Sequence, residues 1–588
     1  MPLTPRPYGR RTTLPASLQI AALVVVLTAV APLLGSYMAR VYQGERVAFA
    51  RVLAPVERLG YRICRVDPDA SQDWKEYARS VLIFSALGVV VLYALLRTQN
   101  IHPFNPQSFH SGPWDLSFNT ATSFVSNTSW QFYAGETTLS YFSQMAGIVV
   151  ASFTSMATGM AVAAAVIRGF GRRGGAGLGN FWVDLIRSLL YVISPVTIVA
   201  ALFLAASGVP QTLDPSVAAH GLTGLKQTIA VGPVASQEAI KLLSGDGGGF
   251  FNVNSAHPFE NPTALTNFVE MLLMLLVPAA FTITFGAMVG SRRTGWALYT
   301  VMLVMFVGGA VAMTLAETHG TPALHAVGVH GAAMEGKEQR FGAAGGALFV
   351  QSGTASGDGA VNSAIESFSG TGSAVAMANI MTGEVIFGGP GVGLYGMLLL
   401  LVLAVFVAGL MVGRTPEFLG KQIRAREVKL ATLGILVAPF LVLALTAVAL
   451  VTPVGLQSVF AHGPQGMSES LYAYLSQTNN NGSAFAGYAG FIQPAPGNIG
   501  AHGVTFADLA GGLAMLLGRF VPIVLALALA GSLSTRRVTP PGLGTLRIET
   551  PTFVLYLVGF VVLVAVLTFL SALVLAPGPQ ALGSRLYG

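Results

Sequence analysis

The chain has 588 residues, of which 53% are hydrophobic and only 10% are charged, and its formal net charge is +7. The charged share is less than half of the ~25% found in soluble domains, so the composition predicts an integral membrane protein. Apolar stretches near the ~20 residues that a helix needs to cross a bilayer predict helices and speak against a β-barrel. The basic residues fall in short loops between these stretches, which indicates membrane topology rather than nucleic-acid binding.

Ten apolar stretches, taken in chain order, are predicted to be membrane-spanning helices. They cover about residues 17–36, 78–97, 141–167, 183–207, 267–290, 295–316, 376–412, 430–452, 507–531 and 551–576. The first has no small-residue cleavage site, so we expect it to be retained rather than removed as a signal peptide. The seventh is too long for one straight span, and the Gly and Pro residues of Phe387–Gly393 should interrupt it.

The connections alternate between short basic loops and long loops with few Lys and Arg residues. The basic loops contain Arg40, Arg46, Arg51, Arg58, Arg62, Arg65, Arg168, Arg172, Arg173, Arg292, Arg293, Arg414, Lys421, Arg424, Arg426, Lys429, Arg536 and Arg537. By the positive-inside rule these loops are cytoplasmic, so both termini should be extracytoplasmic. Arg6, Arg10 and Arg11 near the N-terminus point the other way.

Each of the four long outward loops contains an apolar stretch too short to cross the membrane, which ends in small polar residues. The four endings are SFVSNTSW (Ser123–Trp130), LLSGDGGGFF (Leu242–Phe251), QSGTASGDGAVN (Gln351–Asn362) and SQTNNNGSAFAG (Ser476–Gly487). They recur about every 110 to 125 residues, which predicts four copies of a helix, a re-entrant pore loop and a second helix. The expected fold is therefore an all-α integral membrane protein with four pseudo-symmetric repeats and one extra helix at each end.

These repeats divide the chain into six segments. They are 1–77 (first flanking helix and cytoplasmic loop), 78–170, 171–291, 292–429 and 430–537 (repeats 1 to 4, the third with a broken second helix), and 538–588 (last flanking helix). Irregular backbone is tolerated at membrane depth only where protein buries it or water fills the space that it lines. Loops rich in Gly, Ser, Thr and Asn can point carbonyl oxygens at a dehydrated cation, so four such loops around one axis indicate a cation pathway.

Longer motifs occur along almost the whole chain. They are PLLGSYMARVYQGER (Pro32–Arg46), QDWKEYA (Gln72–Ala78), SNTSWQFYAGE (Ser126–Glu136), SQEAIKLLSGDGGGFFNVNSAHPFENPT (Ser236–Thr263), GAVNSAIESF (Gly359–Phe368), GEVIFGGPGVGLYGML (Gly383–Leu398), GRTPEFLGK (Gly413–Lys421) and NNNGSAFAG (Asn479–Gly487). In sequence and order they resemble the motifs of the KdpA family, the potassium-binding subunits of Kdp-type potassium-transporting ATPases. This family is related to the Trk, Ktr and HKT potassium transporters.

The resemblance implies a subunit that selects extracellular K⁺ and passes it to a P-type ATPase subunit, KdpB, in a high-affinity uptake complex that also contains KdpC and KdpF. It implies K⁺ as the transported ion, no organic cofactor, no nucleic-acid partner, and a multi-pass position among the lipids of the bacterial inner membrane. The chain contains neither a GxxxxGK[ST] phosphate loop nor the DKTGT motif of P-type pumps. ATP hydrolysis is therefore expected in the partner.

Carried over by position, the resemblance implies a K⁺ filter made of three residues from each loop. These are Asn127, Thr128 and Ser129; Gly245, Asp246 and Gly247; Gly357, Asp358 and Gly359; and Asn480, Asn481 and Gly482. Family members usually have neutral residues where this chain has Asp246 and Asp358. Because two carboxylates beside one narrow pore would repel each other, we expect them to turn to backbone N–H donors and brace the loops. The alternative is that they face the mouth and concentrate cations.

Glu384, Gly388 and Gly389 lie in the expected interruption of the seventh span, which in relatives forms a gate or bounds a lateral exit. The alternative is a proline kink with Glu384 at the outer interface. Two other functions stay open: a stand-alone Trk/Ktr/HKT-type channel or symporter, and a membrane enzyme with Asp246, Asp358 and Glu384 as acid and base groups. His257 and Glu260 suggest a metal site, but Pro-rich turns of this kind more often precede a helix.

Overall fold

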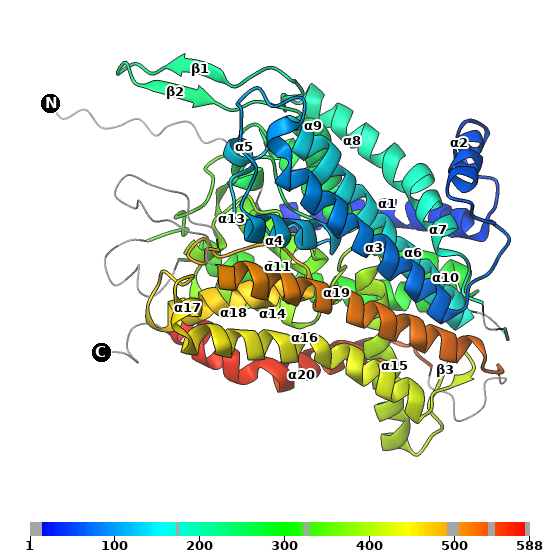
Figure 1. Ribbon diagram of the computed structural model, residues 1–588. Helices are drawn as coiled ribbons and strands as arrows, with labels where there is room; N and C mark the ends of the chain where they lie inside the picture. Colours follow the sequence, from blue (N-terminus) through cyan, green and yellow to red (C-terminus); the bar gives the residue numbers. More distant parts are fainter. Residues whose placement is uncertain are drawn as a thin grey trace.

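The structure is a computed structural model that describes residues 15–171, 174–175, 177–320, 325, 328, 330–490, 505–538 and 547–582. The basic residues Arg6, Arg10, Arg11, Arg172 and Arg173 lie outside this part of the chain. Within it, long helices form a bundle and run roughly in one common direction (Figure 1).

Ten helical segments of the described chain are long and apolar enough to cross a membrane. They are α1 (Ala16–Gln43), α3 (Trp74–Arg97), η2 with α6 (Ser143–Val149 and Val150–Gly171), α7, η3 and α8 (Phe181–Arg187, Ser188–Ile193 and Ser194–Ala206), α10 (Ala264–Met288), α11 (Arg292–Thr318), α15 (Val392–Val412), α16 (Ala425–Val451), α19 (Thr505–Ser534) and α20 (Pro551–Leu575). Each overlaps one predicted span, so the ten predictions are confirmed.

The seventh predicted span is interrupted, as its Gly and Pro residues indicated. A separate helix, α14 (Gly370–Met381), covers its first residues, and α15 alone is long and apolar enough to cross a membrane. Between them, residues 382–391 form an irregular segment in which Gly383, Glu384, Phe387 and Gly391 all have positive φ. Below, residues 382–391 are called the interrupted segment.

Four shorter helices, called pore helices below, lie between the spans and end at the four predicted loop endings. They are α4 (Trp114–Val125), α9 (Val234–Ser244), α13 (Gly342–Ser356) and α18 (Gly463–Asn479). Nearly every residue in their last turns is buried. The order of span, pore helix and span recurs four times, as α3–α4–α6, α8–α9–α10, α11–α13–α15 and α16–α18–α19, with α1 packed on α10 and α20 packed on α11.

The remaining elements lie in the connections. They are α2 (Ala50–Ile63), η1 (Gln99–Ile101), α5 (Gly135–Thr138), η4 (Asn254–Ala256), η5 (Ile365–Ser367), α17 (Pro453–Leu456), α21 (Pro577–Leu582) and two antiparallel hairpins, β1 (Val217–His220) with β2 (Lys226–Ile229) and β3 (Glu417–Phe418) with β4 (Lys421–Gln422). Val217 pairs with Ile229, and Glu417 pairs with Gln422. The two hairpins lie at opposite ends of the bundle (Figure 1).

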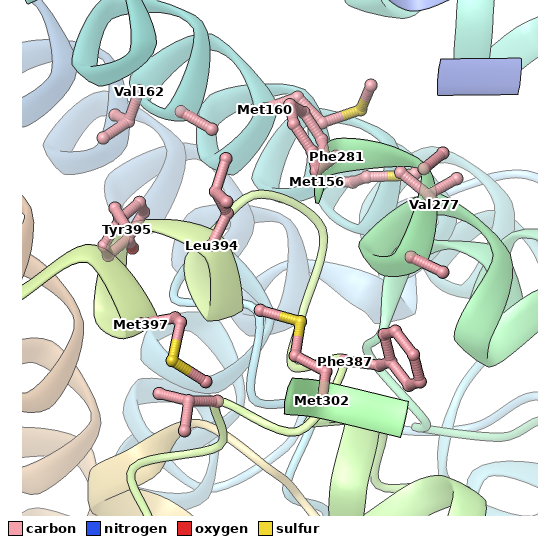
Figure 2. Close-up of a cluster of buried hydrophobic side chains, with 14 of the residues drawn as sticks. Met156, Met160, Val162, Val277, Phe281, Met302, Phe387, Leu394, Tyr395 and Met397 are labelled. Carbon is pink, nitrogen blue, oxygen red and sulfur yellow. The ribbon is translucent and has the colours of Figure 1, made fainter. Parts of the chain in front are cut away.

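The core lies where α6, α10, α11 and α15 meet. Figure 2 shows Met156 and Met160 of α6 close to Phe281 of α10, with Phe387 of the interrupted segment in the same cluster. The ring of Phe387 lies 5.3 Å from that of Tyr299, measured between centroids. Because burial of a large apolar side chain contributes about 1.5–3 kcal/mol, this packing holds the irregular backbone of the interrupted segment in place.

Candidate functional site

Each pore helix ends in the same backbone turn. A left-handed residue stops the helix in all four cases: Asn127 (φ 62°), Gly245 (φ 65°), Gly357 (φ 69°) and Asn480 (φ 65°). The N–H of the next residue donates to the carbonyl oxygen five residues earlier, from Thr128 to Ser123 (2.9 Å), Asp246 to Lys241 (3.3 Å), Asp358 to Gly353 (3.0 Å) and Asn481 to Ser476 (2.8 Å). This is the hydrogen bond of the Schellman motif. The four predicted triads therefore share one backbone register.

The first loop is joined to its neighbours on both sides by amide side chains. Asn127 Nδ2 donates to the carbonyl oxygens of Ser244 (3.1 Å) and Gly245 (3.0 Å) in the second loop. On the other side, Asn480 Nδ2 of the fourth loop donates to Thr128 Oγ1 at 2.8 Å. The first loop is thus fixed between the second and the fourth.

The third loop is joined to the second and the fourth. Gly359 N donates to Asp246 O of the second loop at 3.2 Å. Asn481 Nδ2 of the fourth loop donates to Gly353 O, in the last turn of α13, at 3.2 Å. Together with the contacts of the first loop, these bonds close the four triads into a ring, in chain order. The structure therefore brings the predicted filter residues together.

Two glycines show how closely the loops approach one another. A Cβ on Gly482 (φ 97°) would lie 1.9 Å from Thr128 O and 3.2 Å from Asp246 O, which belong to two different loops. A Cβ on Gly247 (φ 87°) would lie 2.2 Å from Gly359 N. A side chain fits at neither position, so only glycine allows the loops to approach so closely. At Gly482 carbonyl oxygens of two different loops lie near the same point.

The carboxylate of Asp358 binds its own loop. Its Oδ1 accepts a hydrogen bond from Ala360 N at 2.9 Å. At the equivalent position of the fourth loop, Asn481 Oδ1 accepts from Ser483 N at 3.1 Å. Asp358 and Asn481 therefore close the same local turn, one with a carboxyl group and the other with an amide.

Asp246 has a different environment. Its buried carboxylate interacts with the hydroxyl groups of Ser129, Ser152 and Ser244. Neither carboxylate oxygen has a hydrogen bond of ordinary geometry within the described chain. The two aspartates of the repeated Ser-Gly-Asp-Gly sequence thus occupy equivalent backbone positions but have different partners.

The four pore helices all direct their C-terminal ends at the ring, because each triad follows the end of its helix. Unpaired carbonyl groups give the C-terminal end of a helix a partial negative charge of about −0.5. Four such ends around one buried point favour a cation there and disfavour an anion.

Two cavities are lined by residues of the ring. The larger one has a volume of about 870 Å³ and is lined by the last residue of every triad, Ser129, Gly247, Gly359 and Gly482. The smaller one, of about 90 Å³, lies beside the interrupted segment and is lined by Gly383 and Val385, by Asn480 of the fourth loop and by Arg519 of α19.

The predicted gating residues lie against the ring. A Cβ on Gly357 would lie 2.6 Å from Glu384 Oε2 and 3.2 Å from Gly389 N. Glu384 is buried, and Gly388 follows so closely that a Cβ there would overlap Glu384 O. The interrupted segment therefore packs directly against the third loop, and Glu384 does not lie at an exposed interface.

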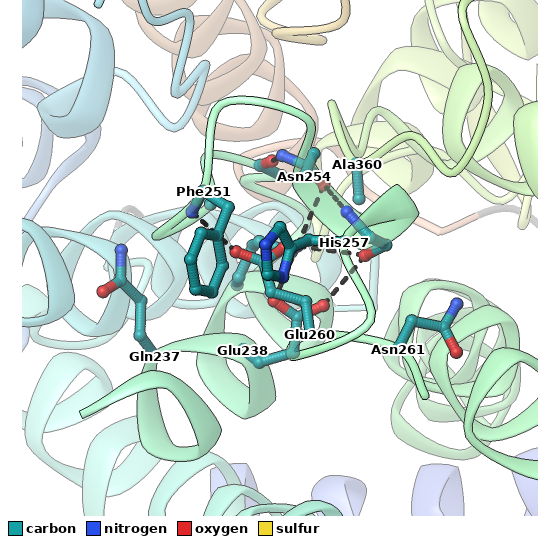
Figure 3. A network of polar contacts seen from close by, with 12 residues as sticks. Gln237, Glu238, Phe251, Asn254, His257, Glu260, Asn261 and Ala360 are labelled. Carbon is teal, nitrogen blue, oxygen red and sulfur yellow. Dashed lines mark hydrogen bonds and ion pairs between the residues drawn. The ribbon is translucent and has the colours of Figure 1, made fainter. Parts of the chain in front are cut away.

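Sequence reasoning missed a network of buried charges behind the second loop, which is centred on Lys241. Figure 3 shows Glu238, Asn254 and Glu260 of this network. The signal for it was a lone lysine in the otherwise apolar sequence AIKLLSG, with Glu238 three residues earlier. Glu260, considered above as a metal ligand, instead accepts hydrogen bonds from Lys241 Nζ and Phe251 N, and His257 stacks on the ring of Phe251. No cluster of His, Cys, Asp or Glu suited to a metal ion occurs among the described residues.

Comparison with known proteins agrees with the motifs. Residues 21–582 match the family described as KdpA, potassium-transporting ATPase A subunit. The chain is 51% identical over 562 residues to the potassium-transporting ATPase potassium-binding subunit of Rhodospirillum centenum, a match that covers 95% of this chain and 96% of the relative. It is 50% identical over 582 residues to the subunit of the same name from Sorangium cellulosum, with 96% and 98% covered.

Among solved structures, the potassium transporter TrkH from Vibrio parahaemolyticus is similar to this chain with a TM-score of 0.49 and 12% identity, over 87% of this chain and 97% of TrkH. The family match and the identities of about one half extend over nearly the whole sequence. The chain belongs to the KdpA family, the A subunits of potassium-transporting ATPases.

Proposed function

We propose that this chain binds K⁺ in the ring of four loops and passes it on to an ATP-hydrolysing partner, as one subunit of a high-affinity uptake complex. The observation that carries the proposal is the closed ring of four triads at the converging C-terminal ends of the pore helices. Relatives of about 50% identity bear the name potassium-transporting ATPase potassium-binding subunit.

The chemistry of the ring suits a monovalent cation. An ion that enters the larger cavity would lose water, and main-chain carbonyl oxygens such as those of Thr128 and Asp246 would replace it. The pore-helix ends supply negative potential without a full charge at every ligand. Binding is then firm enough to remove the hydration shell yet reversible, as conduction requires.

The exit is proposed to lie along the interrupted segment, with Glu384, Gly388 and Gly389 at its boundary. The contact of this segment with the third loop and the 90 Å³ cavity beside it support this route. The partner that receives K⁺ would be the P-type ATPase subunit KdpB, with KdpC, KdpF and membrane lipid completing the complex in the bacterial inner membrane. Because the basic loops of the ten spans are taken as cytoplasmic, both termini would be extracytoplasmic.

The test is a K⁺ titration of ATP hydrolysis by the purified complex, with Rb⁺ and Na⁺ as competitors. Gly247→Asp should strongly reduce the apparent K⁺ affinity, because a side chain there meets Gly359 N. Hydrolysis that does not depend on K⁺ in the wild-type complex, or an unchanged K⁺ dependence in Gly247→Asp, would overturn the proposal. Growth on limiting K⁺ with this chain alone would instead support a stand-alone transporter.

A further inference from the structure

Lys241, in the last turn of α9, places its ammonium group in a fully buried polar site behind the second loop. Lys241 Nζ lies 2.7 Å from Glu238 Oε2 and 2.9 Å from Glu260 Oε2. It also donates to Asn254 Oδ1 at 2.9 Å and to Ser255 Oγ at 3.0 Å. Figure 3 shows Glu238, Asn254 and Glu260, which contact this group. The ammonium group thus has more partners than the three hydrogen atoms it can donate.

The equivalent positions in the other pore helices carry no charge. Lys241 lies four residues before the left-handed residue of its loop, and the residues at this position in the other three loops are Ser123, Gly353 and Ser476. Replacing a buried ion pair by apolar side chains is often neutral or stabilising, so stability alone does not explain a lysine in this place. Lys241 also orients the polar side chains around it, and this effect accounts for a lysine at this position.

That effect is clearest for the side chain of Asn254. Because an ammonium group only donates, the end of the carboxamide that faces Lys241 has to be the carbonyl oxygen. Nδ2 then points the other way and donates to Gly247 O at 2.6 Å. The same Oδ1 accepts from Val361 N, just beyond the third triad, at 3.3 Å. One side chain therefore contacts both the second and the third loop.

The backbone of Asn254 fits this position. Asn254 is a buried residue with φ 58°, a left-handed conformation that asparagine adopts more readily than most residues with a side chain. The hydrogen bonds of its side chain to Lys241, Gly247 and Val361 hold the side chain in one orientation.

We propose that Lys241 and Asn254 are positioning residues for the ring: Lys241 fixes the orientation of the Asn254 carboxamide, which sets the carbonyl of Gly247 and the spacing between the second and third loops. The consequence is discrimination between cations of different size. This inference rests on the proposed function, because it concerns the selectivity of the same ring.

The test compares Asn254→Asp with Asn252→Asp in the purified complex. Asn254→Asp keeps an acceptor for Lys241 but places an oxygen opposite Gly247 O, so the two repel. Asn252 lies two residues earlier and is exposed in the wall of the larger cavity, so Asn252→Asp adds the same charge without touching Gly247. We expect Asn254→Asp to weaken the discrimination of K⁺ from Rb⁺ and Na⁺ by about tenfold, as for one lost buried hydrogen bond, with the maximal hydrolysis rate nearly unchanged.

Equal discrimination in Asn254→Asp and wild type, or equal loss in Asn252→Asp, would overturn the inference. If Asn254→Asp does not assemble, the quadruple variant Lys241→Met, Glu238→Gln, Glu260→Gln, Glu270→Gln decides, because it removes Lys241 together with the three buried carboxyl groups that interact with it and leaves Asn254 in place. It should lose the same discrimination, and wild-type discrimination in it would overturn the inference. Failure of the proposed function would be seen separately, as hydrolysis by the wild-type complex that ignores K⁺.

Discussion

The junction between the first and fourth loops and the junction between the second and third loops close the same ring by different means. The first uses neutral side chains, since Asn480 Nδ2 donates to Thr128 Oγ1. The second uses the main chain, since Gly359 N donates to Asp246 O, and Gly247 leaves no room for a side chain. Behind the second junction lies the buried network of charges, which the first junction lacks among the described contacts.

The difference shows which part of the fourfold arrangement is under strict geometric control. The backbone register is the same in all four loops, because the left-handed residue and the Schellman bond recur in each. The middle residue of the triad varies freely: it is Thr128, Asp246, Asp358 or Asn481. A cation in the ring would therefore meet four similar backbones whose supporting side chains differ.

The largest effect is expected where the backbone itself is obstructed, in Gly482→Ala. The added Cβ would lie 1.9 Å from Thr128 O, and the backbone at φ 97° is already unfavourable for alanine. We expect the apparent K⁺ affinity to fall by about a hundredfold or more, equivalent to about 2.7 kcal/mol. A K⁺ titration of ATP hydrolysis measures this change.

Gly290→Ala is the matched control for this substitution. Gly290 follows α10 with φ 76°, and no described atom lies within 4 Å of the position of its Cβ. Gly290→Ala has the same unfavourable left-handed backbone as Gly482→Ala, but its added Cβ meets no other atom. The K⁺ affinity of the Gly290→Ala complex should therefore remain that of the wild type. A similar loss in both variants would mean that strain, rather than the closeness of the loops, limits the substitution.

Sequence alone predicted the parts of the molecule that depend on local chemistry. Hydropathy located the ten spans, and the four repeated loop endings lie at the ends of the four pore helices. The interruption near Pro390 followed from residues that cannot continue a helix. In each case the signal lies within a few residues of the feature.

The contacts of Asn254 could not be predicted in this way. Its side chain binds Lys241, 13 residues earlier, and Val361, 107 residues later, and neither separation follows a helix or strand period. The helix α2 was also missed, because it is amphipathic rather than apolar throughout and so does not resemble a membrane span. Both hairpins were missed because they are short. Features defined by contacts between distant segments require the fold.

A smaller effect should separate the two aspartates. Asp358→Asn keeps the oxygen that accepts from Ala360 N, as Asn481 does with Ser483 N, so its K⁺ affinity should stay within about twofold of the wild type. The carboxyl group of Asp246 lies next to the ring, and neither of its oxygens has a hydrogen bond of ordinary geometry within the described chain. Asp246→Asn removes its negative charge and should weaken K⁺ binding about fivefold, because the attraction to the cation is lost. Titrations of both variants, side by side, measure the difference. A larger loss in Asp358→Asn would mean that its carboxylate acts on the ion.

The smallest effect concerns the connection between the third and fourth loops, where the carboxyl groups of Glu366 and Glu469 lie side by side. A Cβ on Gly487 would lie 2.2 Å from Glu469 Oε1 and 2.7 Å from Glu366 Oε1. Burial, together with the neighbouring Glu366, raises the pKa of Glu469 from 4.5 to about 7. Between these two values, the native protein therefore keeps a proton on Glu469 that the unfolded chain has released.

Stability contributed by this proton is complete below the pKa of the unfolded chain and is lost as the pH rises through about 7. The midpoint of thermal unfolding of the wild-type complex should fall between about pH 4.5 and 7, and Glu469→Gln should reduce that fall, because its amide does not titrate. The effect should be the smallest of the three, because Glu469 also accepts from Phe460 N and Ala461 N, which favour the charged form. If the unfolding midpoints of the wild type and of Glu469→Gln change with pH in the same way, Glu366 and Glu469 do not hold an extra proton in the native protein. The connection between the third and fourth loops would then depend on hydrogen bonds that do not change with pH, as the junction between the first and fourth loops does.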